Sequence, residues 1–513
     1  MTDVYFQTSN AILKKIFDKA ESNLTGNIRI FDGIKVLVEG TVLYPNVWLE
    51  TQPMGGEMYG KRNLEIALNN HEIFMKYQRD DGRLPGMIST LENGTCRGHY
   101  DWLQGCFFAT SAYLTFFLAR QNDEYLKKLY KSLEKFDEYL WKYRDSDGDG
   151  CLESWCKWDT GEDFSSRLEG VPDYFGGEIP PCESGCAPFE SSDFMGYSHC
   201  NRFILSKISR ILDNGKEEYW AKEARKIREK IKDYLWFNNA CYDRDNNNEL
   251  MQVLTHNTLK AMYFNAVEQD MADNFLREHL LNTNEFWTEM PLPSIAINDS
   301  KFRNIETNNW SGQPEGLTYQ RAIRALENYG HFAEVCLLGE KLIKAASQKF
   351  IFTQQFDPFT GKPSLEDEEG YSGYGPTTLS VLEYISRMFG VHIEEEDVLW
   401  SGLADGSNTY RYTQKWFDKE YKIENDGKMF LCILNEKIIF SCSCGVRIVT
   451  DYDGNLKHLV GISQETKETD FIYNERTTRI SISPNEVYSL NENKKIVLTG
   501  KVPFDYSRDL EII

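Results

Sequence analysis

Hydrophobic positions recur every three or four residues through most of 8–388, the spacing that places side chains on one face of a helix. The clearest segment is 123–143. Its apolar face would carry Leu126, Leu129, Leu133, Phe136 and Leu140. In all, the period predicts about eleven helices. The others are at 8–24, 63–78, 104–120, 191–212, 217–235, 257–266, 271–281, 314–329, 331–347 and 375–388. A short hairpin is expected within 28–38, where apolar and polar residues alternate.

Long segments rich in Gly, Pro, Trp and Tyr separate some of these helices. They are 44–60, 145–186, 282–312 and 352–374. Paired helices whose long loops gather at one end are typical of an (α/α)6 barrel, with a pocket where the loops converge. Beyond Val398 the period changes to two, which predicts β-strands. We therefore expect a mainly α protein in three parts. These are 1–50, a helix and hairpin packed on the barrel; 51–396, the (α/α)6 catalytic barrel; and 397–513, a small C-terminal β-sandwich.

The chain is strongly acidic. Its 513 residues include 57 Lys and Arg against 79 Asp and Glu, a net charge of −22. Such a charge repels nucleic acid and anionic membranes, so we expect neither as a partner and favour a neutral or weakly charged small carbohydrate. No segment approaches the ~20 apolar residues that span a bilayer, and the first residues do not resemble a signal peptide. The sequence predicts a cytoplasmic protein and leaves a homo-oligomer open.

Two groups of residues have the composition, but not the spacing, of a metal site. The first is Cys182, Cys186, His199 and Cys200, whose spacing is not that of a zinc ribbon or finger. The second is the turn 145–150, with oxygen-bearing residues at alternate positions and a sixth-position glycine, as in a calcium loop. Its twelfth position is Cys156, where a calcium loop has a bidentate Glu. We expect a structural turn, reduced cysteines, no metal and no cofactor.

The segment 158–167 combines the residue types of a glycosidase acid site. It places the Asp163 carboxyl beside aromatic side chains, and burial against such faces raises the pKa of a carboxyl. Gly161 allows a substrate to approach the backbone. Asp163 could instead cap a helix that begins near Phe164. Arg167 could orient substrate hydroxyls or pair with an acidic neighbour.

Four motifs extend this interpretation. They are Arg144–Gly150 followed by Trp158-x-x-Gly161-x-Asp163-x-Ser165-x-Arg167; Phe286-Trp287 with Pro293–Ala296; Asn309–Gly312; and Phe356–Pro363. Their types and order are similar to those of the mannosylglycerate hydrolase-type branch of glycoside hydrolase family 63, whose clan includes the trehalases. The resemblance covers roughly residues 50–390 and implies an inverting glycosidase with an (α/α)6 barrel. The C-terminal β region lies outside it.

The resemblance also assigns an acid and a base. In such enzymes one carboxylic acid protonates the glycosidic oxygen while an opposed carboxylate activates water. Asp163 falls on the acid, but Gln354 occupies the base position, and an amide cannot take a proton from water. Three interpretations stay open: an engineered Glu→Gln change at 354, another carboxylate as base, or no hydrolysis at all. The other carboxylate could be Glu315 or one within 366–369. Glu315 could instead lie at the N-terminus of the following helix and interact favourably with its dipole.

We expect an exo-acting, α-glucosidase-like hydrolase of a small glycoside or short oligosaccharide, with Asp163, Gln354 and Glu315 at the catalytic positions. Residues of the matched motifs and long loops are expected to bind the sugar, although each could instead lie in the core. They are Trp158, Gly161, Arg167, Trp310, Tyr59, Arg62, Trp102, Trp287 and Tyr371. The alternatives are a non-catalytic carbohydrate-binding or regulatory barrel, and an inverting glycoside phosphorylase. The phosphorylase is disfavoured because no basic cluster beyond Lys362 lies near Gln354 in the sequence.

Overall fold

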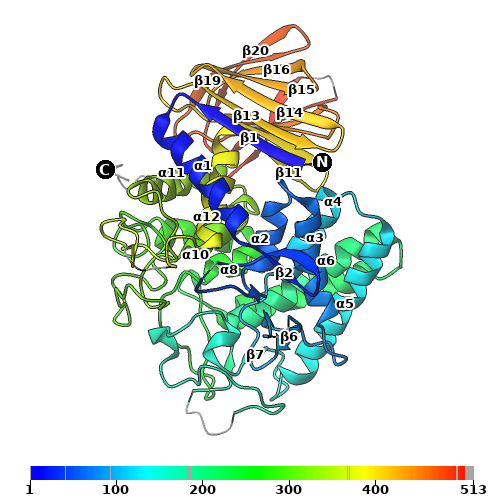
Figure 1. Ribbon diagram of the computed structural model, residues 1–513, viewed down its shortest axis with the longest axis vertical. Coiled ribbons are helices and arrows are strands. Elements are labelled where there is room, and N and C mark those ends of the chain that lie inside the picture. Colours follow the sequence, from blue (N-terminus) through cyan, green and yellow to red (C-terminus); the bar gives the residue numbers. More distant parts are fainter. Residues whose placement is uncertain are drawn as a thin grey trace.

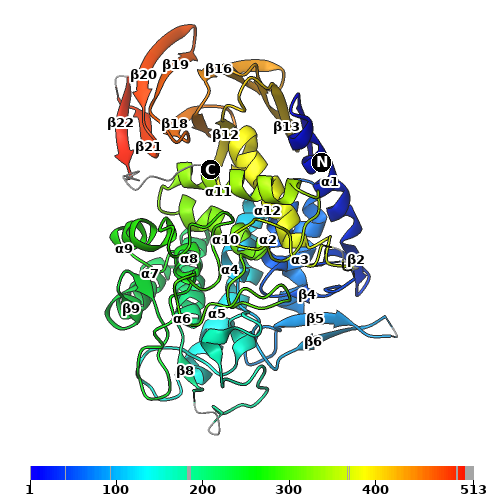
Figure 2. The same cartoon turned by 90° about the vertical axis from the view of Figure 1, so that its left-hand side faces the viewer.

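The computed structural model describes residues 2–40, 42–92, 94–181, 186–366, 368, 370–492 and 495–502. Helices form the larger, lower part of the molecule in Figure 1, and two antiparallel sheets cover them at one end. Figure 2 shows the same division after a quarter turn. One continuous hydrophobic core extends from the helices into both sheets.

The helices lie close to where the hydrophobic period places them. In chain order they are α1 (Ala11–Gly26), α2 (Gln52–Tyr59), α3 (Leu64–Lys76), α4 (Phe108–Leu118), α5 (Asp123–Tyr143), α6 (Ser192–Leu212), α7 (Glu217–Lys230), α8 (Thr258–Tyr263), α9 (Gln269–Phe275), α10 (Gly316–Glu327), α11 (Phe332–Ser347) and α12 (Gly375–Phe389). π-helical turns extend α7 and α9, at Ile231–Leu235 and Leu276–Leu280. Each helix expected from the sequence is present, with ends shifted by a few residues.

The hydrophobic period does not predict α2. All of its residues are buried, so it has no polar face against which a period could be seen. Glycines bring it close to its neighbours. A Cβ at Gly55 would lie 3.3 Å from Leu379 of α12, and one at Gly56 would lie 2.5 Å from Asn70 of α3. The segment 44–60, expected to be a loop, therefore contains a central helix.

The chain beyond α12, together with the N-terminal strand β1, forms two antiparallel sheets, with strand orders β1-β13-β14-β15-β16-β19-β20 and β11-β12-β17-β18-β21-β22. Their strands are β1 (Thr2–Thr8), β11 (Val391–Glu394), β12 (Asp397–Gly402), β13 (Tyr410–Trp416), β14 (Lys419–Asn425), β15 (Met429–Leu434), β16 (Lys437–Ser443), β17 (Val446–Thr450), β18 (Leu456–Gly461), β19 (Lys467–Tyr473), β20 (Arg476–Ile482), β21 (Glu486–Leu490) and β22 (Ile496–Lys501). The sheets pack face to face, because a Cβ at Gly402 of β12 would lie 2.2 Å from the Phe430 ring of β15. The C-terminal region is thus made of antiparallel sheets, as the alternation predicts.

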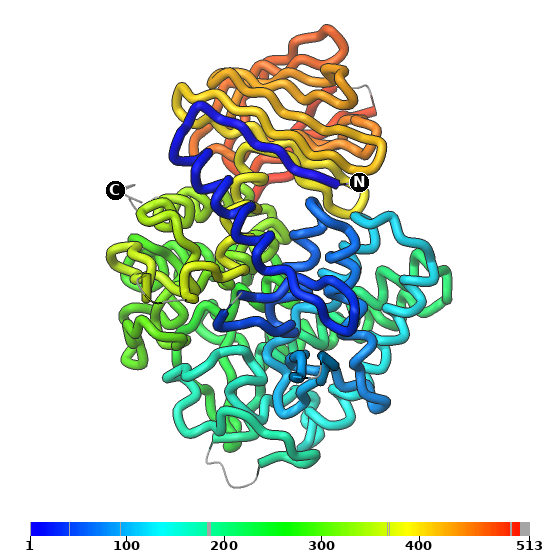
Figure 3. Tube along the Cα trace, in the orientation of Figure 1, coloured from blue at the N-terminus to red at the C-terminus, as the bar shows by residue number. Residues whose placement is uncertain are grey.

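The N-terminal segment belongs to both parts of the molecule. β1 pairs antiparallel with β13 along its whole length, so that Thr8 lies opposite Tyr410. In Figure 3 this blue segment runs beside the yellow strands before α1 descends over the helices. The hairpin of β2 (Ile28–Phe31) and β3 (Ile34–Leu37) follows, as the alternation predicts. Residues 1–50 therefore pack on the helices and also extend a sheet of the C-terminal region.

The long loops lie at the end of the helices away from these sheets (Figures 1 and 2). Short strands brace them. These are β4 (Val47–Trp48), β5 (Met87–Thr90) and β6 (Cys96–His99) in one sheet, β7 (Glu153–Ser154) with β8 (Phe189–Glu190), and β9 (Trp236–Phe237) with β10 (Ala240–Cys241). Within the described ranges, no helix is long and apolar enough to cross a bilayer.

Candidate active site

Asp163 lies in an irregular loop between two short 3-10 helices, Lys157–Asp159 and Ser166–Leu168. Its Oδ2 accepts a hydrogen bond of 2.9 Å from Asn308 Nδ2. Its Oδ1 makes no hydrogen bond of standard geometry among the described residues, although the Gln104 side chain lies near enough to lower the pKa of the carboxyl. Burial raises the pKa of this carboxyl from 3.8 to about 6, and the hydrogen bond from Asn308 opposes that rise. Ser165, not Asp163, occupies the N-cap position of the next short helix, so Asp163 does not serve as its cap.

One side chain joins Asp163 to the expected base position. Gln354 Oε1 accepts a hydrogen bond of 2.9 Å from the Tyr44 hydroxyl, and Gln354 Nε2 donates one of 2.9 Å to Asn308 Oδ1. Asn308 therefore bridges the two positions through its amide. The two hydrogen bonds and the width of the Asn308 amide together limit the distance between Asp163 Oδ2 and Gln354 Nε2 to about 8 Å. This limit is compatible with the roughly 6.5–9.5 Å that separates the two carboxyls of an inverting enzyme.

Glu315 lies next to Gln354 with a fully buried side chain. The backbone N–H of Gly316 donates to the Gln354 carbonyl at 2.8 Å. Neither carboxylate oxygen of Glu315 makes a hydrogen bond of standard geometry in the described part of the chain, although the Gln354 side chain lies near enough to lower its pKa. The side chain makes no capping hydrogen bond to α10. Burial, followed by the charges of Glu50 and Asp163, raises the pKa of Glu315 well above its ordinary range.

Three charged residues that were not among the sequence candidates complete this buried cluster: Glu39, Glu50 and Arg321. Arg321 of α10 pairs with Glu50, and its Nε and Nη1 find no partner among the described residues. Burial raises the pKa of Glu50 to about 7, although the charge of Arg321 lowers it. Glu39 accepts a hydrogen bond of 2.8 Å from Tyr374, and burial still raises its pKa well above its ordinary range. The cluster thus holds more carboxyls than cations.

Gly161 brings the acid loop against this cluster. Its φ is +77°, and a Cβ at this position would lie 2.2 Å from Glu50 Oε1. Backbone conformation and close approach therefore both require glycine. This placement of the loop explains Gly161 without a sugar, and direct contact with substrate stays a prediction.

Aromatic side chains lie beside the acid loop. Trp158 packs edge-on against Trp102 with ring centroids 5.2 Å apart. The indole N–H groups of Trp158, Trp102 and Trp48 have no hydrogen-bond partner in the described ranges. Trp310 is buried, and its backbone N–H donates to the Asp163 carbonyl at 3.1 Å. These side chains offer apolar faces and free donors, the two features that sugars bind.

Arg167 belongs to a buried ion network. Its guanidinium pairs with Glu162 and Asp243. Lys260 pairs with Glu162 at 2.7 Å and with Asp193 at 3.0 Å. The structure therefore shows the acidic pairing that was one of the two alternatives for Arg167.

The other sequence candidates make no hydrogen bond, ion pair or ring contact with Asp163 in the described ranges, and Tyr59 and Trp287 belong to the hydrophobic core. Tyr59 is the last residue of α2, and Arg62 lies just beyond the end of this helix. Arg62 is paired there with Glu21 of α1. Tyr371 is half-buried in the loop before α12. Contact of Tyr59, Arg62 or Trp287 with a substrate stays a prediction.

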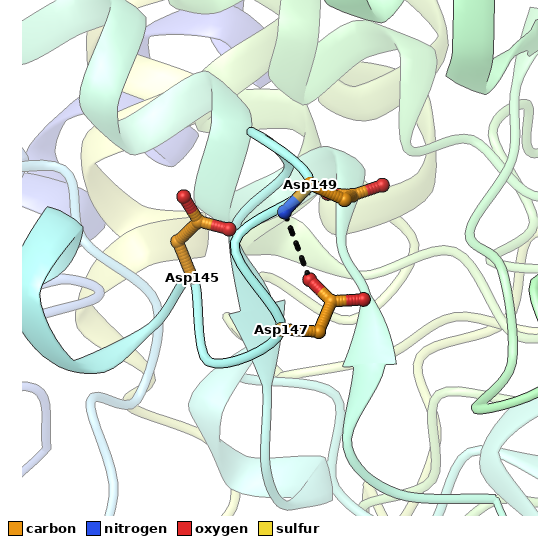
Figure 4. A group of neighbouring side chains, drawn as sticks. All are labelled: Asp145, Asp147 and Asp149. Carbon is orange, nitrogen blue, oxygen red and sulfur yellow. Dashed lines mark hydrogen bonds between the residues drawn. The ribbon is translucent and has the colours of Figure 1, made fainter.

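Of the cysteine-rich group, the described members lie in ordinary packing. His199 Nδ1 lies 2.9 Å from the Phe264 carbonyl, and Cys200 Sγ lies 3.1 Å from the Thr110 hydroxyl. Cys182 lies outside the described residues. In the acidic turn, the oxygens of Asp145, Asp147 and Asp149 come within 4.8 Å of one another (Figure 4).

Residues 53–375 match the family described as the mannosylglycerate hydrolase MGH1-like glycoside hydrolase domain. The chain belongs to this family of glycoside hydrolases. The resemblance seen in the sequence motifs is thereby confirmed. No curated protein sequence matches this family member.

Solved structures share the fold of this glycoside hydrolase at low identity. The family 63 mannosylglycerate hydrolase from Thermus thermophilus, in complex with Tris, matches with a TM-score of 0.59 and 17% identity, covering 72% of this chain and 99% of that one. A sialidase matches with a TM-score of 0.69 and 13% identity, over 88% of this chain and 42% of that one. The neutral trehalase from Saccharomyces cerevisiae matches with a TM-score of 0.53 and 12% identity, over 72% and 80%. The helical part therefore has the six-hairpin glycosidase-like fold.

Proposed function

We propose that this glycoside hydrolase is an inverting, exo-acting α-glycosidase with α-glucosidase-like specificity. Asp163 is its general acid, and Glu315 supplies the base that Gln354 cannot. The proposal includes closure of the helices into an (α/α)6 barrel around the acid loop. The observation that carries it is the pairing of a carboxyl of raised pKa with the Gln354 position through Asn308, beside the buried carboxyl of Glu315.

Asp163 has the properties of a general acid. A pKa of about 6 leaves part of its population protonated near neutral pH, as proton donation to a glycosidic oxygen requires. Buried polar atoms are nearly always hydrogen-bonded, so an Oδ1 that makes no bond of standard geometry in the described part indicates the position of a water or a substrate oxygen.

Glu315 is the carboxyl best placed to act as base. The Gln354 amide can hold a water but cannot accept its proton. The Glu315 oxygens make no hydrogen bond of standard geometry in the described part, whereas Glu366, from the acidic run 366–369, pairs with Lys349. Residues 367 and 369 of that run lie outside the described residues. Because burial raises the pKa of Glu315 and so disfavours the ionised form that accepts a proton, we expect slow hydrolysis.

The composition of the cluster favours a neutral sugar. Four carboxyls, Glu39, Glu50, Asp163 and Glu315, lie near one guanidinium. Such a site attracts hydroxyl donors and repels anions. The Thermus enzyme has been solved in complex with glucose, which supports a neutral hexose as the bound sugar.

Gln354 also favours a second candidate, a non-catalytic carbohydrate-binding protein, because aromatic faces and unpaired donors bind sugar without a base. A phosphorylase receives less support. Attack by phosphate needs available cations, and both Arg321 and Lys260 are paired with carboxylates.

Hydrolysis of a panel of α-linked disaccharides and glucosyl-glycerates tests the proposal, with the product anomer followed by NMR. We expect Asp163→Asn and Glu315→Gln each to lower kcat/KM by ~10²–10⁴. We expect Gln354→Glu to raise kcat/KM by ~10² and to make it independent of Glu315, because the new carboxylate then takes the proton. The matched control is Glu366→Gln, which leaves kcat/KM unchanged.

Retention of the anomeric configuration, or full activity of Asp163→Asn, contradicts the proposed mechanism. Full activity of Glu315→Gln assigns the base elsewhere. Sugar binding by the unaltered chain, with turnover in Gln354→Glu alone, supports the carbohydrate-binding candidate instead.

A further inference from the structure

Phe164, the residue after the acid Asp163, has a backbone conformation that a bulky side chain rarely adopts. Its φ is +55°, in the left-handed region that glycine and asparagine favour. Hydrogen bonds on both sides hold it there. The N–H of Trp310 donates to the Asp163 carbonyl at 3.1 Å, and Ser165 Oγ donates to the Trp310 carbonyl at 2.8 Å. The surrounding structure therefore imposes this strained conformation on Phe164.

The ring of Phe164 is also left uncovered. Two other phenylalanines in the described ranges have a positive φ, and a cation lies over the ring of each. Lys15 Nζ lies 3.8 Å from the ring centroid of Phe350, and the Arg120 guanidinium lies 4.5 Å from that of Phe417. Phe164 is 52% exposed, and neither a cation nor an aromatic ring lies over it in the described part of the chain. Its ring is thus available to a ligand.

Phe164 lies where the acid loop opens to solvent. Gly161 and Glu162 are buried, Asp163 is half-buried and Phe164 is exposed. In an exo-acting glycosidase the released sugar lies inside the site and the leaving group extends outward. The acid protonates the oxygen that joins the two. An exposed side chain directly beside the acid is therefore in position to meet the leaving group.

We propose that Phe164 binds the leaving group of the substrate and that this group is a neutral sugar ring. The inference rests on the proposed glycosidase function and deepens it by naming the substrate class, an α-linked disaccharide. An aromatic face packs against the C–H groups of a pyranose over most of its area, whereas a short acyclic alcohol covers little of it. The excess of carboxyls over cations in the neighbouring cluster disfavours an anionic leaving group.

Sugar binding accounts for both unusual features of Phe164. A strained backbone and an exposed apolar ring each act against stability, and asparagine would fill the same turn with neither. Such features persist where they serve a site. The hydrogen bonds that fix the turn also hold the ring in place before a ligand arrives, which reduces the entropy lost on binding.

Kinetics with two substrates test the role of Phe164. One is an α-linked glucose disaccharide. The other is α-glucosylglycerol, whose leaving group has no ring but still needs a proton from Asp163. We expect Phe164→Asn, which suits a positive φ and so should fold, to lower the ratio of kcat/KM for the disaccharide to that for glucosylglycerol by ~3–10-fold, mainly through KM. Phe164→Tyr keeps the ring and should keep the ratio.

Phe417→Asn is the matched control. It also replaces a phenylalanine of positive φ, in the turn between β13 and β14, and should leave the ratio unchanged. An unchanged ratio in Phe164→Asn would overturn the proposal. Equal losses for both substrates would also overturn it, because Phe164 would then act by placing the acid.

Calorimetry separates this inference from the proposed function. If no α-glycoside is hydrolysed, even by Gln354→Glu, the proposed hydrolase is rejected, but binding can still be compared. The unaltered chain should bind the disaccharide more tightly than glucose, and Phe164→Asn should lose ~3–10-fold of this preference. A preference that survives in Phe164→Asn would place the second sugar elsewhere and overturn the role of Phe164.

Discussion

Two buried groups of charged side chains in this molecule contain the same residue types but differ in their ratio of carboxyls to cations. Where the helices meet the sheets, Glu327 of α10 pairs with Arg447 of β17 at 2.6 Å and with Arg387 of α12 at 3.3 Å. Burial acts to raise its pKa, but the charges of Arg387 and Arg447 outweigh it, so the pKa is lowered. Asp163 has no ion-pair partner among the described side chains, and its pKa is raised.

The difference separates stability from chemistry. Matched charges that cross from helices to sheet fix the relative position of the two parts, and breaking one leaves a buried charge alone. Near Asp163 the carboxyls outnumber the single guanidinium of Arg321, so burial raises their pKa values. We expect substitutions in the two groups to affect different measured quantities.

The largest effect is expected at the acid. Asp163→Asn should lower kcat/KM by ~10³ while leaving the free energy of unfolding at pH 7 unchanged or increased, because it removes an unpaired buried carboxyl. Kinetics and urea unfolding of the same preparation measure both. A variant that loses activity and stability together would show that Asp163 has a structural role.

The opposite result is expected at the junction. Glu327→Gln should reduce the free energy of unfolding by about 3–5 kcal/mol, because it leaves two buried guanidinium groups without their carboxylate. Urea unfolding measures this loss, and KM of the folded variant should not change. Glu424→Gln, whose carboxyl pairs with Arg411 at the surface of the sheet, is the matched control, with an expected cost below ~1 kcal/mol.

Stability should depend on pH in opposite directions for the two groups. Asp163 has a folded pKa of about 6 against an ordinary 3.8, so its contribution is full below pH 3.8 and lost as pH rises to about 6. Glu327 has a lowered pKa, so its contribution is present above pH 4.5 and lost as pH falls. Asp163→Asn should therefore remove a decline of ~2–3 kcal/mol between pH 4 and 6. Urea midpoints across this range measure it, and an unchanged slope contradicts the raised pKa.

The smallest effect is expected at Gly161, which brings the acid loop against Glu50. Gly161→Ala should cost ~1–3 kcal/mol of stability, because alanine is strained at positive φ and its Cβ would displace Glu50. It should also lower kcat, since the acid loop must move. Gly148→Ala tests the strain alone, because it shares a positive φ but its Cβ would meet nothing within 4 Å. Equal losses of kcat in both variants would argue against the contact with Glu50.

Much of the fold follows from the sequence because the helices have one polar face. The start of α5 is placed by Asn122, whose side chain accepts hydrogen bonds from the N–H groups of Glu124 and Tyr125. α2 could not be found this way, because burial on every side removes the period. β1 could not be paired from the sequence either, since its partner lies at the other end of the chain.

The site was harder to predict because its members come from different loops. Asp163 and Gln354 were found through motifs, but the side chains that connect and surround them, Asn308, Tyr44 and Glu39, have no local signal. Glu50 lies just before α2, in the segment 44–60 that was expected to be a loop, and no motif there marks its carboxylate.

The pairing of β1 with β13 also affects the order in which the molecule can assemble. The backbone N–H of Thr409 donates to Ser9 Oγ across 400 positions of sequence. During synthesis from the N-terminus, residues 2–8 are made long before their partner strand, so one end of the sheet stays open until nearly all helices exist. An unpaired edge attracts other strands, including those of a second nascent chain. The step at which β1 is added therefore decides whether newly made chains complete their own sheet or exchange this strand with a neighbour.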